Sequence, residues 1–174
     1  MEIRALRPND DRSAFQSGDE ALDRFFRNYA GQNQFRHYLG VTYVAVEDSR
    51  VLAFATVAPG QLDVDELPAA TRKKMPRCPL PILRPARLAV DRSAQSQGLG
   101  TQLLRFVFQL AGKMADDYGC AGMVVDAKSS AVSFYARYGF VPFDALEGQS
   151  EARPRPAMMF LAMRAIKAAS DVAD

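Results

Sequence analysis

The sequence predicts a single α/β domain in which helices cover both faces of a mixed sheet. Its 174 residues are close to the size of one domain. With 48% hydrophobic and 24% charged residues, the chain has the composition of a globular protein that buries a core. Strand-like and helix-like segments follow one another in the order βα(α)ββαβαβαββ, which is typical of a sheet packed between helices.

The amino-terminal part predicts a helix followed by a β-hairpin. Ser17-Gly18-Asp19-Glu20 is typical of a capping box, in which the Ser17 hydroxyl and the Glu20 carboxylate bond free N–H groups at a helix start. The helical spacing of the large apolar residues that follow predicts that helix; they are Leu22, Phe25, Phe26 and Tyr29. Residues 41–46 and 51–57 are rich in β-branched residues and flank a polar turn, so we expect a hairpin that Pro59 and Gly60 end.

Proline, glycine and apolar spacing predict the remaining elements. A short helix is expected within 63–75, followed by a proline-rich loop over 76–85 and a strand over 86–90. The longest helical pattern begins after the glycines at 98 and 100 and is closed by Gly119. Beyond it we expect a strand, a helix and two strands, over 122–126, 130–138, 140–143 and 157–163.

The net charge of +2 conceals a local excess of positive charge. Residues 71–92 hold seven basic side chains against Asp91 alone, a net charge of +6. Six of them are candidates to bind the phosphates of a polyanion: Arg72, Lys73, Lys74, Arg77, Arg87 and Arg92. A solvated protein face has the same composition, so the charge alone leaves both interpretations open.

Composition argues against several classes of protein. No apolar run approaches the roughly 18 residues of a membrane-spanning helix, and the first residues carry no export signal, so we expect a cytoplasmic protein without a membrane partner. Cys78 and Cys120 form no CxxC motif and His37 is the one histidine, so no metal site is expected. We expect both thiols to be buried and His37 to lie at the surface.

The segment between a predicted strand and the longest helix predicts an anion site. Leu88-Ala89-Val90 precedes a loop whose two glycines lie at the helix start, so free N–H groups and the positive helix end point at one spot. The spacing fits neither a Rossmann fingerprint nor a P-loop, because there is no GxxxxGK[ST]. We therefore expect a pyrophosphate bound without a metal ion.

A second segment, Phe134-Tyr135-Ala136-Arg137-Tyr138-Gly139-Phe140, offers a proton donor. On a helix Phe134 and Tyr138 share one face, while Tyr135 lies one position round and can present its hydroxyl to a cleft. A phenol with a pKa of about 10 is protonated at neutral pH and can protonate a leaving thiolate. Packing alone also explains a tyrosine at this position.

Together the two segments resemble the GNAT N-acetyltransferase superfamily. Gln95-Ser96-Gln97-Gly98-Leu99-Gly100 matches the family's [RQ]-x-x-G-x-[GA] motif, and residues 134–140 match F-Y-x-x-x-G-F, in the same order. The resemblance implies a GNAT-like, mostly antiparallel twisted sheet, acetyl-CoA as co-substrate and Tyr135 as the catalytic acid near the sulfur. It implies that the cofactor contacts Leu88, Ala89, Val90, Gln95, Ser96, Gln97, Gly98, Leu99, Gly100, Thr101 and Phe134. Lys128 departs from the asparagine that many members place there, which puts contacts from that turn in question.

The amino-terminal segment is similar to one branch of that superfamily, the toxins encoded with ribbon-helix-helix antitoxins. Residues 15–34 resemble its F-x-C-G-x-x-x-L-x-x-[FW]-L and A-x-x-N pattern, with Ser17 in place of the cysteine, and Arg87-Leu88-Ala89-Val90-Asp91 is also typical of it. The resemblance covers about 1–165, taken as the acetyltransferase domain, and leaves 166–174 as a C-terminal tail. It implies acetylation of the α-amino group of aminoacyl-tRNA, which blocks translation, and an antitoxin partner.

Two other functions stay open. One is an acetyltransferase for a protein or small-molecule primary amine, although a cationic substrate suits an acidic cleft better than the basic 71–92 block. The other is a non-catalytic module that keeps acyl-CoA only as a ligand, against which the presence of Tyr135 argues. No carboxylate is placed as an obvious general base. The oligomeric state is open, with a homodimer among the expectations.

Overall fold

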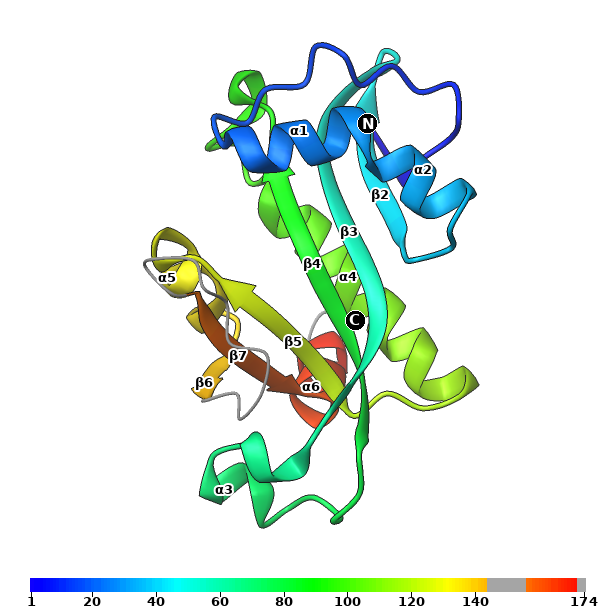
Figure 1. Ribbon diagram of the computed structural model, residues 1–174. Helices are drawn as coiled ribbons and strands as arrows, with labels where there is room; N and C mark the ends of the chain where they lie inside the picture. The colour runs from blue at the N-terminus through cyan, green and yellow to red at the C-terminus, as the bar shows by residue number, and fades with distance from the viewer. Residues whose placement is uncertain (144–155, 172–174) are drawn as a thin grey trace. The chain divides into compact units, whose positions relative to one another are not determined.

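The computed structural model describes residues 1–143 and 156–171 (Figure 1). The strands are β1 (Glu2–Ala5), β2 (Val41–Glu47), β3 (Arg50–Leu62), β4 (Leu80–Val90), β5 (Gly122–Ala127), β6 (Val141–Phe143) and β7 (Ala157–Ala162). The α-helices are α1 (Glu20–Asn28), α2 (Ala30–Phe35), α3 (Ala69–Arg72), α4 (Leu99–Asp117), α5 (Val132–Ala136) and α6 (Met163–Asp171). Among these described residues, no helix is both long and apolar enough to cross a bilayer.

Seven strands form one sheet in the order β1-β2-β3-β4-β5-β7-β6. The β1–β2, β2–β3, β5–β7 and β6–β7 pairs are antiparallel. The β4–β5 pair is parallel, with Ile82 opposite Gly122 and Leu83 opposite Met123. The predicted α/β fold with a mixed, mostly antiparallel sheet is therefore confirmed.

The chain divides into two compact units, and the first comprises residues 1–58 and 85–110. Its core contains the stacked rings of Phe26 and Phe54, 4.3 Å apart, with Phe15 edge-on to both. Val44 lies opposite Phe54 in the β2–β3 ladder and joins the same cluster. Neighbouring residues of a strand face opposite sides. Tyr43 accordingly packs on Phe106 of α4, ring centroids 5.1 Å apart, so helices cover both faces of this part of the sheet.

The second unit comprises residues 59–84 and 111–174, of which 144–155 and 172–174 lie outside the described residues. Its core is formed by apolar side chains from β3, β4, β5, β6 and β7 and from the 3₁₀ turn Val64–Glu66: Leu62, Val64, Leu80, Ile82, Val124, Phe143 and Phe160, with Leu67 beside them. β5 and β7 approach closely at Gly122, where an added Cβ would lie 2.3 Å from the Leu161 carbonyl oxygen. A glycine is therefore required there by packing.

The hairpin, the long helix and the last strand lie where the sequence predicts them, whereas the first helix cap is wrong. Asp48 and Ser49 both have positive φ in the turn between β2 and β3, as a tight hairpin turn requires. The N-cap of α1 is Asp19, whose carboxylate accepts from the Leu22 N–H at 3.2 Å. Ser17 instead donates its hydroxyl to the Asp23 carboxylate at 2.6 Å. A residue two positions nearer to the helix occupies the cap.

The ends of two strands, which proline and glycine were expected to mark, lie elsewhere in the structure. β3 continues through Pro59 and Gly60 to Leu62, and Gly60 packs close to β4, since an added Cβ would lie 3.1 Å from Ile82 Cδ1. β4 begins at Leu80 and contains two prolines. Proline lacks an N–H but keeps its carbonyl, and that of Pro81 accepts from the Ala121 N–H at 2.7 Å.

Three further predictions differ from the structure. The helix expected within 63–75 is broken at Pro68, whose extended conformation separates the Val64–Glu66 3₁₀ turn from α3. The helix expected over 130–138 is a 3₁₀ turn followed by the short α5. Cys120 is buried but Cys78 is exposed. The predicted tail begins inside α6, so residues 166–171 are helical, and the domain boundary stays a prediction.

Candidate active site

The loop that links β4 to α4 has the geometry of an anion site. Ser96 and Gly98 both have positive φ, and the Gly98 carbonyl accepts the Gln102 N–H at 3.1 Å as α4 begins. The N–H groups of a first helical turn have no partner inside the helix, and they lie at its positive end. A Cβ at Gly98 would meet nothing within 4 Å, so the space beside this turn is open. A pyrophosphate fits this donor set.

Asp91 anchors that loop to two other segments of the first unit. Its buried carboxylate accepts from the N–H of Gln16 at 3.0 Å, from the N–H and hydroxyl of Ser93 at 3.0 and 2.7 Å, and from Arg50 at 3.2 Å. Burial opposes ionisation of Asp91, but these hydrogen bonds and the Arg50 charge outweigh it and lower the pKa of the carboxyl. The loop is therefore held by an ionised side chain at neutral pH.

Gln95 makes a second link in the same place. Its side-chain amide donates to the Val90 carbonyl at 3.0 Å and to the Ser17 carbonyl at 2.7 Å. The Arg92 N–H also donates to the Gln16 carbonyl at 2.8 Å. The side-chain amide nitrogen of Gln95 is thus engaged within the protein and helps to fix the loop.

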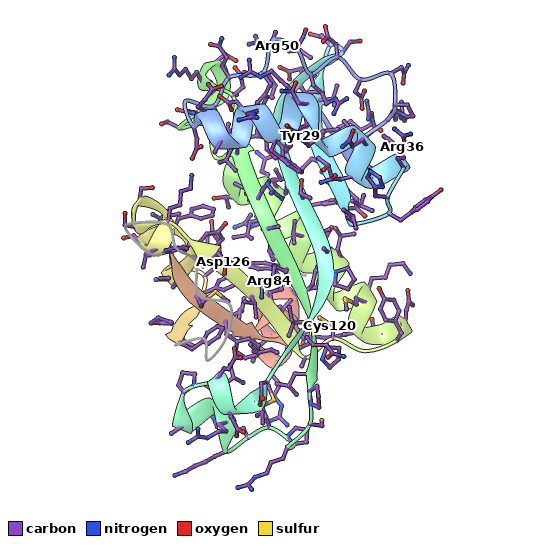
Figure 2. All side chains as sticks on the ribbon, viewed as in Figure 1. Tyr29, Arg36, Arg50, Arg84, Cys120 and Asp126 are labelled. Atoms are coloured by element: carbon purple, nitrogen blue, oxygen red, sulfur yellow. The ribbon has the colours of Figure 1, made fainter. Side chains whose placement is uncertain are left out.

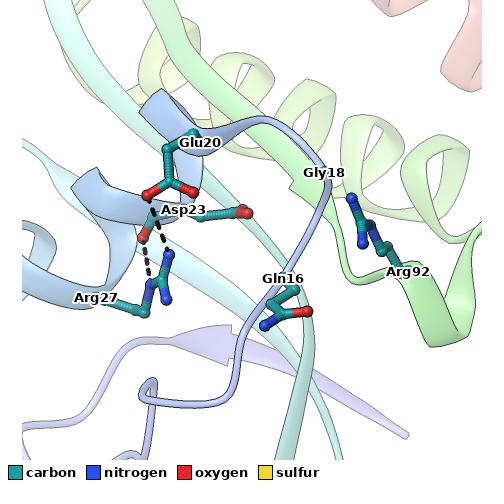
Figure 3. Close-up of a pocket in the computed structure, with 6 residues that line it drawn as sticks. All are labelled: Gln16, Gly18, Glu20, Asp23, Arg27 and Arg92. Atoms are coloured by element: carbon teal, nitrogen blue, oxygen red, sulfur yellow. Dashed lines mark hydrogen bonds and ion pairs between the residues drawn. The ribbon is translucent and has the colours of Figure 1, made fainter.

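A polar hollow of about 290 Å³ lies between this loop and α1 (Figure 3); it is lined by Gln16, Gly18, Glu20, Asp23, Arg27 and Arg92. Arg27 is engaged there, with Glu20 at 3.7 Å and the Asp23 carbonyl at 3.3 Å. Arg92 is exposed, and its Nε would lie 3.3 Å from a Cβ at Gly18, whose φ is +99°. The positive φ favours glycine at position 18, since the exposed Arg92 side chain could move away from a Cβ there.

The end of β4 presents its residues to two different faces. Ala89 belongs to the core beneath α1, so its side chain is covered. Leu88 and Val90 are partly exposed and lie 4.0 and 3.7 Å from where a Cβ at Gly100 would be. Arg87 lies with its guanidinium carbon 3.7 Å above the centroid of the Phe25 ring, and burial lowers its pKa. Of the two arginines near this end, Arg92 is the more accessible to a polyanion.

Tyr135 lies in the second unit, inside a cluster of aromatic rings. Its ring centroid is 5.2 Å from that of Phe134 and 5.4 Å from that of Phe140, and 8% of the residue is exposed. Burial raises the pKa of Tyr135 to about 12. Phe134 also contacts Tyr138, centroids 5.4 Å apart. The phenol is therefore fully protonated at neutral pH, as a proton donor must be.

The remaining basic candidates lie on α3 and the segment that follows it. Arg72, Lys73, Lys74 and Arg77 are all exposed. Arg77 shares a hollow of about 390 Å³ with Asp63 and Asp65. Arg84, the seventh basic residue of the 71–92 block, pairs with Asp126 at 3.2 Å (Figure 2). The predicted basic block is thus divided, with these residues in the second unit and Arg87 and Arg92 in the first.

The structure brings some predicted residues together and leaves others in separate units. Leu88, Val90 and Gly100 are neighbours in the first unit, and Phe134 and Tyr135 are neighbours in the second. Lys128 is exposed at the 3₁₀ turn that precedes α5. Sequence reasoning missed Asp91 as a structural anchor, although its place as the single acid of a basic block was a usable signal.

Comparison with known proteins adds a family and several relatives. Residues 39–142 match the model of the acetyltransferase (GNAT) domain. A protein of Mycobacterium tuberculosis strain H37Rv, called tRNA-acetylating toxin, is 34% identical over 140 residues, which cover 79% of this chain and 82% of the relative.

Two solved structures share the fold along nearly the whole chain. One, described as AtaTR bound with AcCoA, has a TM-score of 0.78 and 26% identity, with 97% of each chain covered. Another, described as AtaT complexed with acetyl-methionyl-tRNAfMet, has a TM-score of 0.83 and 24% identity, with 97% of this chain and 98% of the other covered. At that identity the second likeness concerns the fold.

Proposed function

The chain belongs to the GNAT acetyltransferase family, and from this premise we propose that it is a toxin that acetylates the α-amino group of aminoacyl-tRNA. The observation that carries the proposal is the 34% identity with the mycobacterial tRNA-acetylating toxin over most of both chains. An N-acetylated aminoacyl group has no free amine to accept the growing peptide, so translation stops. The reaction takes place in the cytoplasm, where charged tRNA is used. Residues 1–165 form the acetyltransferase domain and 166–174 the tail.

Acetyl-CoA is the donor, as the AcCoA-bound relative at 26% identity supports. Acetyl-CoA supplies an acetyl group activated as a thioester. The amides of residues 95–101 hold its pyrophosphate, because two positive-φ residues turn the chain there and leave Gly98 beside open space. Leu88 and Val90 offer apolar contact, Ala89 offers its backbone, and Phe134 packs beside Tyr135.

The transfer step joins the amine nitrogen to the acetyl carbon and breaks the carbon–sulfur bond. The neutral α-amine attacks the carbonyl carbon and later releases its extra proton to solvent. Tyr135 donates a hydrogen bond, and then its proton, to the sulfur as negative charge develops on it, and the resulting phenolate takes a proton back from solvent. With a pKa of about 12, the phenol keeps its proton until that charge appears. No metal ion is required for this chemistry.

The RNA is held through exposed cations. Arg72, Lys73, Lys74, Arg77 and Arg92 are exposed and suited to phosphate contacts, whereas Arg87 is half-buried on Phe25 and serves mainly to pack β4 against α1. The partner that controls the toxin is a ribbon-helix-helix antitoxin, as the resemblance of residues 15–34 and 87–91 implies. We propose a homodimer as its oligomeric state.

The test is transfer of radiolabelled acetyl groups from acetyl-CoA to purified aminoacyl-tRNA. The expected product is a labelled N-acetylaminoacyl ester on the tRNA, which mild alkali hydrolyses to a labelled N-acetylamino acid, with deacylated tRNA as the control substrate. Cells that express the protein alone should stop growing, and cells that express Tyr135→Phe should not. Label in protein or in a small amine, with none in aminoacyl-tRNA and no growth arrest, would establish the other acetyltransferase function instead.

A further inference from the structure

The turn between α2 and β2 holds an aromatic side chain in water at a strained position. Tyr38 has a φ of +55°, in the left-handed region that favours glycine or asparagine, and is 85% exposed. The Leu39 N–H bonds the Asn33 carbonyl at 2.9 Å, which ties this turn to the end of α2. A tyrosine at this position stabilises neither the backbone conformation of the turn nor the hydrophobic core. A strained backbone conformation that does not stabilise the fold points to a function of this side chain at the surface.

Hydrogen bonds make this turn rigid. The side chain of Gln34 donates to the Leu6 carbonyl at 3.2 Å and accepts from the Thr42 N–H at 2.8 Å, so α2 is fixed to the chain after β1 and to β2. The N–H groups of Arg36 and His37 both bond the Gln32 carbonyl, at 3.0 and 3.1 Å. The turn therefore presents Tyr38 in a preorganised position, which lowers the entropy cost of binding.

The surroundings of Tyr38 are aromatic and basic. Phe35 is 39% exposed and Leu39 63% exposed, and Arg36 and His37 between them are exposed as well. Residues 24–46 contain three arginines and His37 but no aspartate or glutamate. Figure 2 shows Tyr29 and Arg36 at the two ends of α2, and Tyr29 is a further exposed aromatic residue. The absence of carboxylates favours a polyanion over an apolar protein surface.

We propose that Tyr38, with Arg36 and His37 beside it, is a stacking platform for an unpaired base of the RNA substrate. Aromatic rings and arginine planes bind splayed bases by stacking, and neighbouring cations bind the phosphates. The inference rests on the proposed aminoacyl-tRNA substrate and adds a recognition surface outside the 71–92 block. It assigns to α2 and the turn after it the task of holding a single-stranded part of the RNA.

The test compares Tyr38→Gly with Tyr38→Phe in the full-length protein. Glycine removes the ring and relieves the strained φ, so the free energy of unfolding should stay equal or rise. The probe is a short single-stranded RNA that contains 2-aminopurine, whose fluorescence is quenched by stacking. We expect about tenfold weaker binding and loss of quenching in Tyr38→Gly, wild-type values in Tyr38→Phe, and wild-type values in Tyr118→Ala, which removes another exposed tyrosine.

Kinetics provide the second measurement. The KM for aminoacyl-tRNA should rise about tenfold in Tyr38→Gly, with unchanged kcat and unchanged KM for acetyl-CoA. Unaltered RNA binding and KM would overturn the platform, even where wild-type protein acetylates tRNA. A loss of dimers in Tyr38→Gly with unaltered RNA binding would overturn it too, and would identify an interface between copies. If the protein acetylates only small amines but its RNA binding still depends on the Tyr38 ring, the stacking platform is supported and the proposed function is rejected.

Discussion

The loop before α4 and helix α5 hold the two predicted parts of the chemistry in opposite ways. The loop is polar and is fixed by hydrogen bonds from Asp91 and Gln95 to segments far away in the sequence. The ring of Tyr135 on α5 is instead packed against the rings of Phe134 and Phe140, and no hydrogen bond to its hydroxyl is found among residues 1–143 and 156–171. An anion site needs oriented amides, whereas a proton donor must hold its proton at the working pH, and burial keeps the phenol in its neutral form.

The different roles of the loop and α5 are tested most directly by removing the Tyr135 hydroxyl. Tyr135→Phe keeps the ring that packs on Phe134 and Phe140, so stability and acetyl-CoA affinity should hold, while kcat falls by roughly 10² to 10⁴. Stopped-flow detection of free CoA thiol measures kcat, and calorimetry measures affinity. Wild-type turnover in this variant would assign the proton to water or to another acid.

Tyr138→Phe is the matched control on the same helix face as Phe134, and it should turn over at the wild-type rate. Because the pKa of Tyr135 is about 12, wild-type kcat should show no loss from phenol ionisation between about pH 8 and 10. A fall of activity near pH 10 that Tyr135→Phe lacks would mean that the phenol is more solvated in the complex than burial indicates.

The loop is tested by placing charge among its amides. A Cβ at Gly100 would lie 3.7 Å from Val90 Cγ2, an ordinary contact, so Gly100→Ala should fold and bind acetyl-CoA nearly as the wild type does. Gly100→Glu suits the first turn of a helix but repels an anion, so acetyl-CoA affinity should fall at least about tenfold. Calorimetry on both variants decides this. Equal affinity for both would exclude the loop as the pyrophosphate site.

The two compact units also carry different parts of the basic block, and salt dependence separates their contributions. If the cations on and after α3 contact phosphates, replacing Arg72, Lys73 and Lys74 by alanine should reduce the slope of log KM against log salt by about two. Acetyl-CoA affinity should not change. Lys113→Ala with Lys167→Ala is the control, since both lysines are ion-paired with aspartates. A slope that only Arg92→Ala reduces would confine RNA contacts to the first unit.

Local patterns predicted what local forces determine. The glycine loop, the long α4 and the hairpin follow from spacing and turn chemistry within about 20 residues, and each is present in the structure. The ends of β3 and β4 could not be predicted that way, because Gly60 and Pro81 are placed by contacts with Ile82 and Ala121. Proline and glycine mark turns only where no such contact decides the conformation.

Local sequence patterns were equally limited in predicting the candidate site. The motifs identified the loop and Tyr135 as chemistry-bearing segments, but charge counting could not tell Arg87, which lies over Phe25, from the exposed Arg92. Asp91 was missed because its partner Gln16 is 75 residues away. Side chains that act through the loop, rather than on the substrate, are recognised from burial and hydrogen bonds.

The smallest expected effect concerns that anchor. Asp91→Asn keeps the shape but weakens the hydrogen bonds from Gln16, Ser93 and Arg50, so the free energy of unfolding should fall by about 1 to 3 kcal/mol at pH 7. The folded-state pKa of Asp91 lies below its ordinary 3.8, so its stabilisation is fully present above about pH 5 and is lost as the pH falls through the folded value.

Urea unfolding of wild type and Asp91→Asn at pH 7 and pH 3 should therefore show a difference that shrinks in acid. Asp65→Asn, at an exposed carboxylate, should change little at either pH. Equal stability of the two proteins at pH 7 would mean that shape, rather than charge, holds the loop in place.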